Sequence, residues 1–371
     1  MMKHIIIGAG ILGASTALHL VEKGEEVVII DRFEPGQATR NAAGIICPWL
    51  TNRSNKDWYE LVIRGAAYYE PLVERLVEYG ERETGYRKTG AINLFDTDEK
   101  LDRKYDLAVE RRREATEMGE LSKLTTKETR EMFPLVSESY RALHISGAAR
   151  VNGDKVAQAM LNASVKLGAA YIKGDARLLM HSGNVEGVEV NGRTINADRY
   201  LLTSGAWMNQ LFQDVGLKSN VHFEKAQILH FEMPEFATEN WPVVLPPFNH
   251  YILSFDKGKI VVGATKEKRS DFNVDVTAGA VHQLLDKALR VAPGLAEAAH
   301  VETKVGFRPF TKGNTPVLGN VPGIENLIVA NGLGASGLTS GPYVGLQLAN
   351  LASGNTVDLP LENYPPSSLF L

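Results

Sequence analysis

Three glycines near the N-terminus have the spacing of a phosphate-binding turn. Gly8, Gly10 and Gly13 lie between two apolar runs, and Asp31 ends the second run. Glycine at these positions allows a tight turn, close approach of the backbone to a pyrophosphate, and close packing of a helix on a strand. The helix N-terminus then faces the phosphates, and the acid accepts hydrogen bonds from ribose hydroxyls. A glycine-rich turn without a ligand is the alternative, but the order of strand, turn, helix, strand and acid favours a dinucleotide, either NAD or FAD.

A second glycine-rich segment lies near the C-terminus, at residues 331–341. It follows a short apolar run and precedes an apolar helix, so a second set of backbone N–H groups is available to an acceptor. A reduced flavin carries negative charge near N1 and O2, which a positive helix end would stabilise. Taken alone, the segment is interpreted equally well as an ordinary glycine-rich connection.

The patterns between these segments predict an α/β protein. Strand 3–7, helix 12–23 and strand 26–30 form a βαβ unit, whose β-branched strands are typical of a buried parallel sheet. Residues 221–264 are rich in strand patterns. Further helices are expected at 57–79, 97–120, 154–168, 281–292 and 341–351, with Asp154 as the cap of the third. Because dinucleotide-type elements stand at both ends, we expect the substrate region to be inserted between pieces of one cofactor domain.

Charge and cysteine content restrict the class of ligand. The chain of 371 residues has 40 basic and 44 acidic side chains and a net charge of -4. This balance lacks the broad basic field that non-specific nucleic-acid binding needs, so we expect a small-molecule partner and no nucleic acid. The single cysteine, Cys47, excludes an intrachain disulfide and an all-thiolate metal site, and it fits a reducing compartment. The nine histidines show no ligand spacing, so no metal is expected.

The N-terminal apolar stretch imitates part of a secretory signal. Lys3 and His4 precede the apolar residues 5–18, which resembles the charged and apolar regions of a signal peptide. The βαβ interpretation accounts for the same stretch and for its glycines. No other segment approaches eighteen uninterrupted apolar residues. We therefore expect a cytoplasmic protein without integral membrane contact, and a homo-oligomer stays open.

Four stretches of the sequence, in this order and spacing, resemble the D-amino-acid oxidase superfamily of FAD-dependent amine oxidoreductases, which includes glycine oxidase, sarcosine oxidase and D-amino-acid dehydrogenases. The resemblance extends over nearly the whole chain. The stretches are the N-terminal fingerprint ending in Asp31, residues 39–46, residues 203–207, and residues 305–319 with the second glycine-rich segment.

The resemblance implies a fold and a cofactor. The fold is α/β, with a Rossmann-type FAD-binding domain like that of glutathione reductase and a substrate domain of mixed or antiparallel sheet with helices. The implied FAD domain is discontinuous, at 1–85, 145–220 and 305–371, and the substrate domain comprises 86–144 and 221–304. Covalent attachment of flavin in part of the superfamily uses a cysteine in the C-terminal portion, where this chain has none. We therefore expect non-covalent FAD and interpret Cys47 as a small buried hydrophobe.

The resemblance also assigns cofactor-binding residues. Residues 39–46 run along the flavin in the family, where small side chains admit the ring system and polar groups hold the pyrophosphate. Residues matching Gly205 and Trp207 lie near the adenosine, and Ala176 stands where the family often has a valine whose backbone contacts adenine. For Arg40, a surface charge is the alternative. The predicted cofactor-binding residues are Gly8, Gly10, Ile11, Leu12, Gly13, Asp31, Arg32, Thr39, Arg40, Ala43, Gly44, Ile45, Ala176, Ser204, Gly205, Trp207, Gly334, Ala335, Ser336, Gly337, Leu338 and Thr339.

Arg308 and Tyr251 are the expected catalytic residues. A guanidinium pairs bidentately with a carboxylate and thereby fixes both its position and its orientation. The arginine matching Arg308 does this in glycine and D-amino-acid oxidases, although a salt bridge at a sheet edge is the commoner fate of an arginine. Tyr251 matches an active-site tyrosine of the glycine oxidase branch, and a buried tyrosine with a satisfied hydroxyl is an equal alternative. His250 would face the other side of a regular strand, so only a supporting role is expected for it.

The function implied by these features is oxidation of the C–N bond of a small amino acid or secondary amine. Hydride transfer to flavin N5 would give an imine, which water hydrolyses to an oxo acid. An NAD-dependent dehydrogenase is one alternative, but it leaves the second glycine-rich segment unexplained. A flavin-binding module in RNA modification is another, and the missing basic patch argues against it. The particular amine and the electron acceptor stay open.

Overall fold

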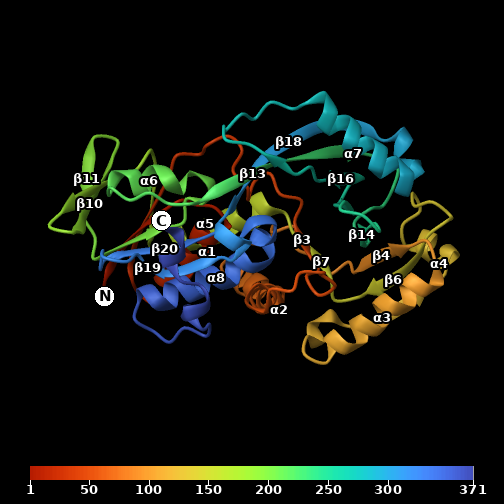
Figure 1. Ribbon diagram of the computed structural model, residues 1–371, viewed down its shortest axis with the longest axis horizontal. Helices are drawn as coiled ribbons and strands as arrows, with labels where there is room; N and C mark the ends of the chain where they lie inside the picture. Colours follow the sequence, from red (N-terminus) through yellow and green to blue (C-terminus); the bar gives the residue numbers. More distant parts are fainter. Residues whose placement is uncertain (371) are drawn as a thin grey trace.

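The computed structural model describes residues 1–370, and a six-stranded sheet forms one of its two halves (Figure 1). All neighbouring strands of this sheet are parallel except the pair at one edge, β19 and β20. The strand order is β19 (Val317–Asn320), β20 (Leu327–Asn331), β12 (Arg199–Leu202), β1 (Lys3–Ile7), β2 (Glu26–Asp31) and β8 (Ala170–Lys173). Ile6 of β1 belongs to the core on one face and Ile7 to the core on the other, as expected for strands buried on both sides.

Helices cover one face of this sheet, and a small antiparallel sheet covers the other. Helix α1 packs against α5 and α8, and α2 packs against α8. The bounds of these helices are Ile11–Glu22 for α1, Lys56–Glu78 for α2, Gly153–Lys166 for α5 and Gly337–Ala352 for α8. The opposite core contains residues of β9 (Arg177–His181), β10 (Asn184–Val190) and α6 (Met208–Asp214). Strand β11 (Arg193–Ile195) completes the small sheet beside β10.

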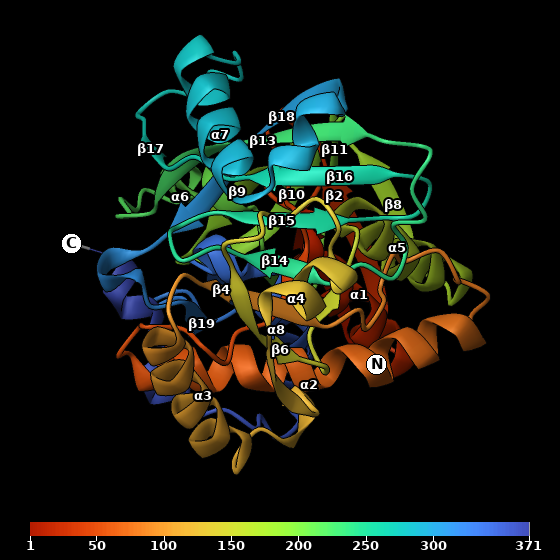
Figure 2. The same cartoon turned by 90° about the vertical axis from the view of Figure 1, so that its right-hand side faces the viewer.

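A second, larger sheet forms the other half of the molecule. Figure 2 shows β13, β16, β15 and β14 side by side, with α7 (Ala278–Val291) above them. The strand order is β17 (Glu267–Lys268), β13 (His222–Glu232), β16 (Lys259–Gly263), β15 (Tyr251–Ser254), β14 (Val243–Leu245), β4 (Ala91–Phe95), β6 (Arg141–Ile145) and β5 (Leu121–Leu124), and β18 (Ala299–Phe310) also pairs with β13. The pairs are antiparallel except β14 with β4. The sheet is therefore mixed, which is one of the two arrangements that were predicted.

The remaining elements are short or lie at the periphery. Helices α3 (Asp98–Arg112) and α4 (Thr126–Met132) pack on the β4–β6–β5 end of the second sheet, and β3 (Ile45–Ile46) pairs with β7 (Ala149–Arg150). The short 3-10 helices are η1 (Thr116–Met118), η2 (Gly205–Trp207), η3 (Pro293–Glu297), η4 (Lys312–Asn314), η5 (Gly334–Ser336), η6 (Leu361–Asn363) and η7 (Pro366–Leu369). None of the helices within residues 1–370 has the length and apolar character needed to cross a membrane.

The structure corrects three predicted helix boundaries. The Asn152 side chain caps α5 by accepting a hydrogen bond from the Lys155 N–H at 3.0 Å, so the expected Asp154 cap is wrong. The helix expected at 97–120 ends at Arg112, and α8 begins at Gly337 instead of residue 341. The earlier start of α8 brings its first turn into the second glycine-rich segment.

The two sheets meet where β18 passes the loop after β2. The Phe307 N–H donates a hydrogen bond to the Gly36 carbonyl at 2.9 Å, and Gln37 forms a parallel bridge with Phe307. Strand β18 therefore touches the loop that follows the N-terminal βαβ unit. The division into an FAD domain at 1–85, 145–220 and 305–371 and a substrate domain remains a proposal, and β18 runs across its predicted boundary at residue 305.

Candidate active site

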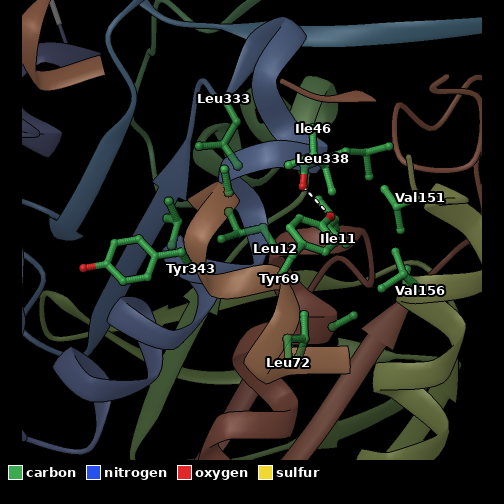
Figure 3. Packing of buried hydrophobic residues seen from close by; sticks show 14 of the residues in the cluster. Ile11, Leu12, Ile46, Tyr69, Leu72, Val151, Val156, Leu333, Leu338 and Tyr343 are labelled. Atoms are coloured by element: carbon green, nitrogen blue, oxygen red, sulfur yellow. Dashed lines mark hydrogen bonds between the residues drawn. The ribbon is translucent and has the colours of Figure 1, made fainter. Parts of the chain in front are cut away.

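A cavity of about 510 Å³ lies where these elements converge. Its lining comes from the start of α1, the loop after β2, η2, the start of α8, and strands β13, β15 and β18. Ile11, Leu12 and Leu338 are among the lining residues, and Figure 3 shows them packed together near Tyr69 of α2, whose hydroxyl donates a hydrogen bond to the Leu338 carbonyl. The first turns of α1 and α8 thus lie side by side and form part of the cavity wall.

Every α-helix that lacks a side-chain cap begins at this cavity, among residues 1–370. Helices α1, α6 and α8 have no side-chain cap, and residues at each of their starts line the cavity. The other helices are capped by Asn55, Thr97, Thr125, Asn152 and Thr277. An uncapped helix start leaves backbone N–H groups available to a ligand and carries partial positive charge. At the start of α6 the Met208 N–H already donates to the Gly205 carbonyl of η2, and in α1 the Ile11 N–H donates to Thr39. The start of α8 and the remaining N–H groups of the first turn of α1 suit an anionic ligand such as a dinucleotide.

The fingerprint glycines have separate roles in forming this space. A Cβ on Gly13 would lie 1.9 Å from the Gly8 carbonyl oxygen, so Gly13 allows α1 to pack closely on the turn after β1. A Cβ on Gly10 would meet only the Thr39 hydroxyl, at 3.2 Å, and Gly10 lines the cavity. Its missing side chain therefore leaves space for a ligand. Gly13 itself does not line the cavity; it acts through packing.

Asp31 lies at one end of the cavity with its carboxylate fixed. One carboxylate oxygen accepts the Ala9 N–H at 2.7 Å, and the other accepts the Phe33 N–H at 2.7 Å and the Gln37 amide at 2.9 Å. Asp31 also lines an adjoining cavity of about 230 Å³, together with the predicted residues Arg32 and Ala176. The ribose and adenine of a dinucleotide therefore have a fitting place at this end.

We expect Asp31→Asn to weaken FAD binding by about 10- to 100-fold, the range for a lost charge-assisted hydrogen bond. The measurement is the visible flavin absorbance that remains after extended dialysis. Asp286→Asn, which changes an exposed carboxylate on α7, serves as the matched control. Full flavin retention in Asp31→Asn would contradict the ribose role, provided that both variants melt at the wild-type temperature.

Most residues of the predicted flavin-lining stretch face the cavity, but Arg40 does not. Thr39, Ala43, Gly44 and Ile45 line it, and the Thr39 hydroxyl accepts the Ile11 N–H at 2.9 Å. The Arg40 guanidinium instead lies over the Phe33 ring, 4.4 Å from its centroid, and its Nε is 3.4 Å from Asp154. Arg40 lines neither cavity. Its position agrees with the alternative interpretation of a surface charge.

The remaining predicted cofactor residues are gathered around the same cavity. Trp207 lines both cavities, and its ring stacks on Phe272 with centroids 5.0 Å apart. The others line the main cavity along η2 and the start of α8: Ser204, Gly205, Gly334, Ala335, Ser336, Gly337, Leu338 and Thr339. Their assignment to individual cofactor atoms remains a proposal.

Arg308 and Tyr251 lie together at the end of the cavity formed by the second sheet. Both line the cavity, Arg308 from β18 and Tyr251 from β15. Burial raises the pKa of Tyr251, and the adjacent Arg308 guanidinium opposes this shift. Gly263 makes room for the tyrosine, because a Cβ there would lie 2.5 Å from the Tyr251 hydroxyl. The tyrosine is therefore a neutral hydroxyl donor beside a cation at neutral pH.

The structure adds polar lining residues that the sequence patterns did not identify. Asn93, Asn249 and Lys266 line the cavity, and so does His250, which was expected to face away. The expectation for His250 fails because β15 begins one residue later, so strand alternation does not apply to it. Burial lowers the pKa of His250, which keeps its ring neutral at neutral pH.

Cys47 also faces the cavity, as a thiol. Burial raises its pKa to about 12, so it carries no charge at neutral pH. No group of three or more histidine, cysteine, aspartate or glutamate side chains in the described part of the chain could hold a metal ion. The chemistry of the cavity is therefore that of backbone N–H groups, one fixed carboxylate, and cations at the other end.

This arrangement suits an oxidoreductase in which helix starts would hold a dinucleotide beside a substrate pocket. A family model described as "FAD dependent oxidoreductase" (DAO) matches residues 3–351. The chain belongs to this family, which confirms the predicted family, α/β fold and FAD cofactor. The NAD-dependent alternative is thereby excluded.

Three relatives place the chain within the family. It is 51% identical over 368 residues to the uncharacterized oxidoreductase YurR of Bacillus subtilis, covering 99% of both chains. It is 28% identical over 358 residues to the glycine oxidase of Geobacillus kaustophilus, covering 93% of this chain and 91% of that one. The crystal structure of iminodiacetate oxidase (IdaA) from Chelativorans sp. BNC1 has a TM-score of 0.94 and 43% identity, over 98% of each chain.

Proposed function

We propose that this flavoenzyme oxidises the Cα–N bond of a small amino acid or secondary amine that carries a carboxylate. The observation that carries the proposal is Arg308, whose guanidinium lines the same cavity as the cofactor-binding residues. Two relatives support it, since glycine oxidase and iminodiacetate oxidase are named for substrates that share an N–CH₂–carboxylate group.

Arg308 and Tyr251 bind and orient the substrate in the proposed reaction. Arg308 binds the carboxylate through two parallel hydrogen bonds and so fixes the α-carbon in one orientation. The Tyr251 hydroxyl donates a hydrogen bond to the same carboxylate. When bound, FAD supplies a two-electron acceptor for the hydride that leaves the α-carbon. The amine nitrogen loses a proton, and water adds to the resulting C=N bond. The products are an oxo acid and either ammonia, from a primary amino acid, or an amine, from a secondary one.

The cavity does not require a side-chain base. Asp31 is the only carboxylate among the residues that line it, and it belongs to the opposite end. A substrate amine that enters in its neutral form needs no carboxylate to remove a proton before oxidation. Orientation by Arg308 is then the main contribution of the protein at the substrate.

An anaerobic titration of the holoenzyme tests the proposed function. We expect glycine, sarcosine or a related N-carboxymethyl amine to bleach the visible flavin absorbance, with about one equivalent of oxo acid formed per flavin. Ethylamine and methylamine serve as controls without a carboxylate and should leave the spectrum oxidised. Bleaching by these simple amines at the same rate, or by none of the carboxylates, would overturn the proposal.

A further inference from the structure

A lysine at the substrate end of the cavity has no acidic partner. Lys266 lines the cavity three residues after the end of β16, and its side chain is exposed. The neighbouring acid, Glu267, accepts hydrogen bonds from Gln227 at 2.7 Å and Thr265 at 2.9 Å and pairs with Arg269. Lys266 forms no ion pair within the described residues, 1–370. Its ammonium group is therefore free to bind a ligand.

Lys266, just before β17, and Arg308 of β18 face the same side of the second sheet, because both line the cavity. Lys225 of β13 pairs with Glu267, and the Thr265 N–H donates to the Gln227 carbonyl at 3.2 Å, so Lys266 lies beside Ala226. On the other edge of β13, Arg308 pairs with Glu224, two residues from Ala226. Residues two apart on a strand, and residues opposite one another on paired strands, share a face.

The distance between the two cations suits a small ligand. Two strand spacings of about 5 Å and two residues of about 3.4 Å separate the backbones of Lys266 and Arg308 by roughly 12 Å. Ala226 lies between them and lines the cavity with a single methyl group. Because lysine and arginine side chains are long, their charged groups can approach a molecule of a few carbon atoms from both sides of β13.

The charges at this end of the cavity are unbalanced. Lys266 and Arg308 are cationic, His250 is neutral, and the only lining carboxylate is Asp31 at the adenosine end. Glu224 does not line the cavity and forms no ion pair with either cation within residues 1–370. A substrate with one carboxylate would satisfy Arg308 and leave Lys266 without an anion. Two anionic groups on one substrate would satisfy both.

We propose that the substrate is an amine dicarboxylate, with one carboxylate on Arg308 and the second on Lys266. This inference rests on the proposed function and narrows its substrate class. The amine nitrogen then lies between the two carboxylates, above Ala226, and the methylene group next to Arg308 is the one presented for oxidation. Lys266 acts as a specificity residue that selects the second acid group. The similarity to an enzyme named iminodiacetate oxidase agrees with this assignment.

Binding of non-oxidisable analogues to the oxidised holoenzyme tests the assignment. Diglycolate has two carboxylates around an ether oxygen, and methoxyacetate has one. We expect the wild-type protein to bind diglycolate more tightly than methoxyacetate, measured by perturbation of the flavin spectrum. Lys266→Met should reduce this preference by about 10- to 100-fold, the range for a charge-assisted hydrogen bond. Lys266→Arg should restore part of it.

A matched variant separates a local effect from a change in net charge. Lys259→Met removes the same charge from the exposed start of β16, outside the cavity, and should keep the wild-type preference. The assignment is overturned if Lys266→Met weakens both analogues equally, or if the wild-type protein shows no preference. These measurements need no turnover, so a Lys266-dependent preference would stand even if no amine reduced the flavin. Conversely, flavin reduction with an unchanged preference in Lys266→Met would contradict this inference alone.

Discussion

Replacing Arg308 with alanine is expected to weaken the binding of carboxylate ligands on the order of 100- to 1000-fold, because a bidentate charged pair in the cavity is lost. Arg308 lies on β18 at the sheet end of the cavity, away from Asp31 and the helix starts that suit the dinucleotide. The variant should therefore keep its FAD. Titration of the flavin spectrum with methoxyacetate measures the effect, and the absorbance of the purified variant measures cofactor content.

Two variants separate the effect of the Arg308 guanidinium from the effects of the neighbouring hydroxyl and of positive charge alone. Tyr251→Phe keeps the cation and removes only the neighbouring hydroxyl, so we expect a loss of about 10-fold or less. Arg308→Lys keeps the charge but not the planar pair of donors, and it should restore only a small part of the affinity. Unchanged methoxyacetate binding in Arg308→Ala would remove the basis of the proposed substrate class.

Gly13→Ala is expected to produce protein without FAD and with lower thermal stability. The added Cβ would lie 1.9 Å from the Gly8 carbonyl oxygen and 2.6 Å from the Thr203 hydroxyl, so α1 must move away from β1. Overpacking of this kind destabilises a protein by about 1–3 kcal/mol. Because the uncapped start of α1 lines the cavity, the displacement also moves backbone N–H groups away from the cofactor. Flavin absorbance and the melting temperature measure the two effects.

Gly279→Ala is the matched control for this substitution. Gly279 also lies near the start of a helix, α7, but a Cβ there meets nothing within 4 Å. Alanine should stabilise α7 by up to about 1 kcal/mol and leave FAD content unchanged, since alanine is the better helix former. A Gly13→Ala protein with full flavin and the melting temperature of wild type would show that the packing at this turn is not needed for cofactor binding.

The cofactor end of the site was predictable because its geometry is local. Strand β1, the glycine turn, helix α1 and strand β2 follow one another directly, so Gly10 and Asp31 meet through short connections. The site also requires a specific residue type at each position, a residue without a side chain at Gly10 and an acid at Asp31. The second glycine-rich segment could not be assigned to the cofactor from its own pattern. Its position after β20 and the packing of α8 on α1 place it there.

The substrate end was only partly predictable because it depends on strand order. Asn93 reaches the cavity since β4 pairs in parallel with β14, where it lies opposite Leu245, another lining residue. Lys266 reaches it since β17 continues beside β13. No spacing in the sequence encodes either pairing, and a single lysine or asparagine has no pattern of its own. Arg40 shows the opposite case, because its neighbours line the cavity while Asp154 and Phe33 hold its side chain outside.

The junction of α1 with α8 has a consequence for the order of events during synthesis. The Ser15 hydroxyl of α1 donates a hydrogen bond to the Pro342 carbonyl of α8 at 2.6 Å, between residues that are 327 positions apart in the chain. In the parallel sheet, β12 lies between β1 and β20, so its second neighbour is absent until β20 has been synthesised. A nascent chain on the ribosome thus exposes the apolar side of α1 until residues 337–352 have emerged. Because the start of α8 lines the cavity, we expect the flavin to be incorporated only after translation has passed α8.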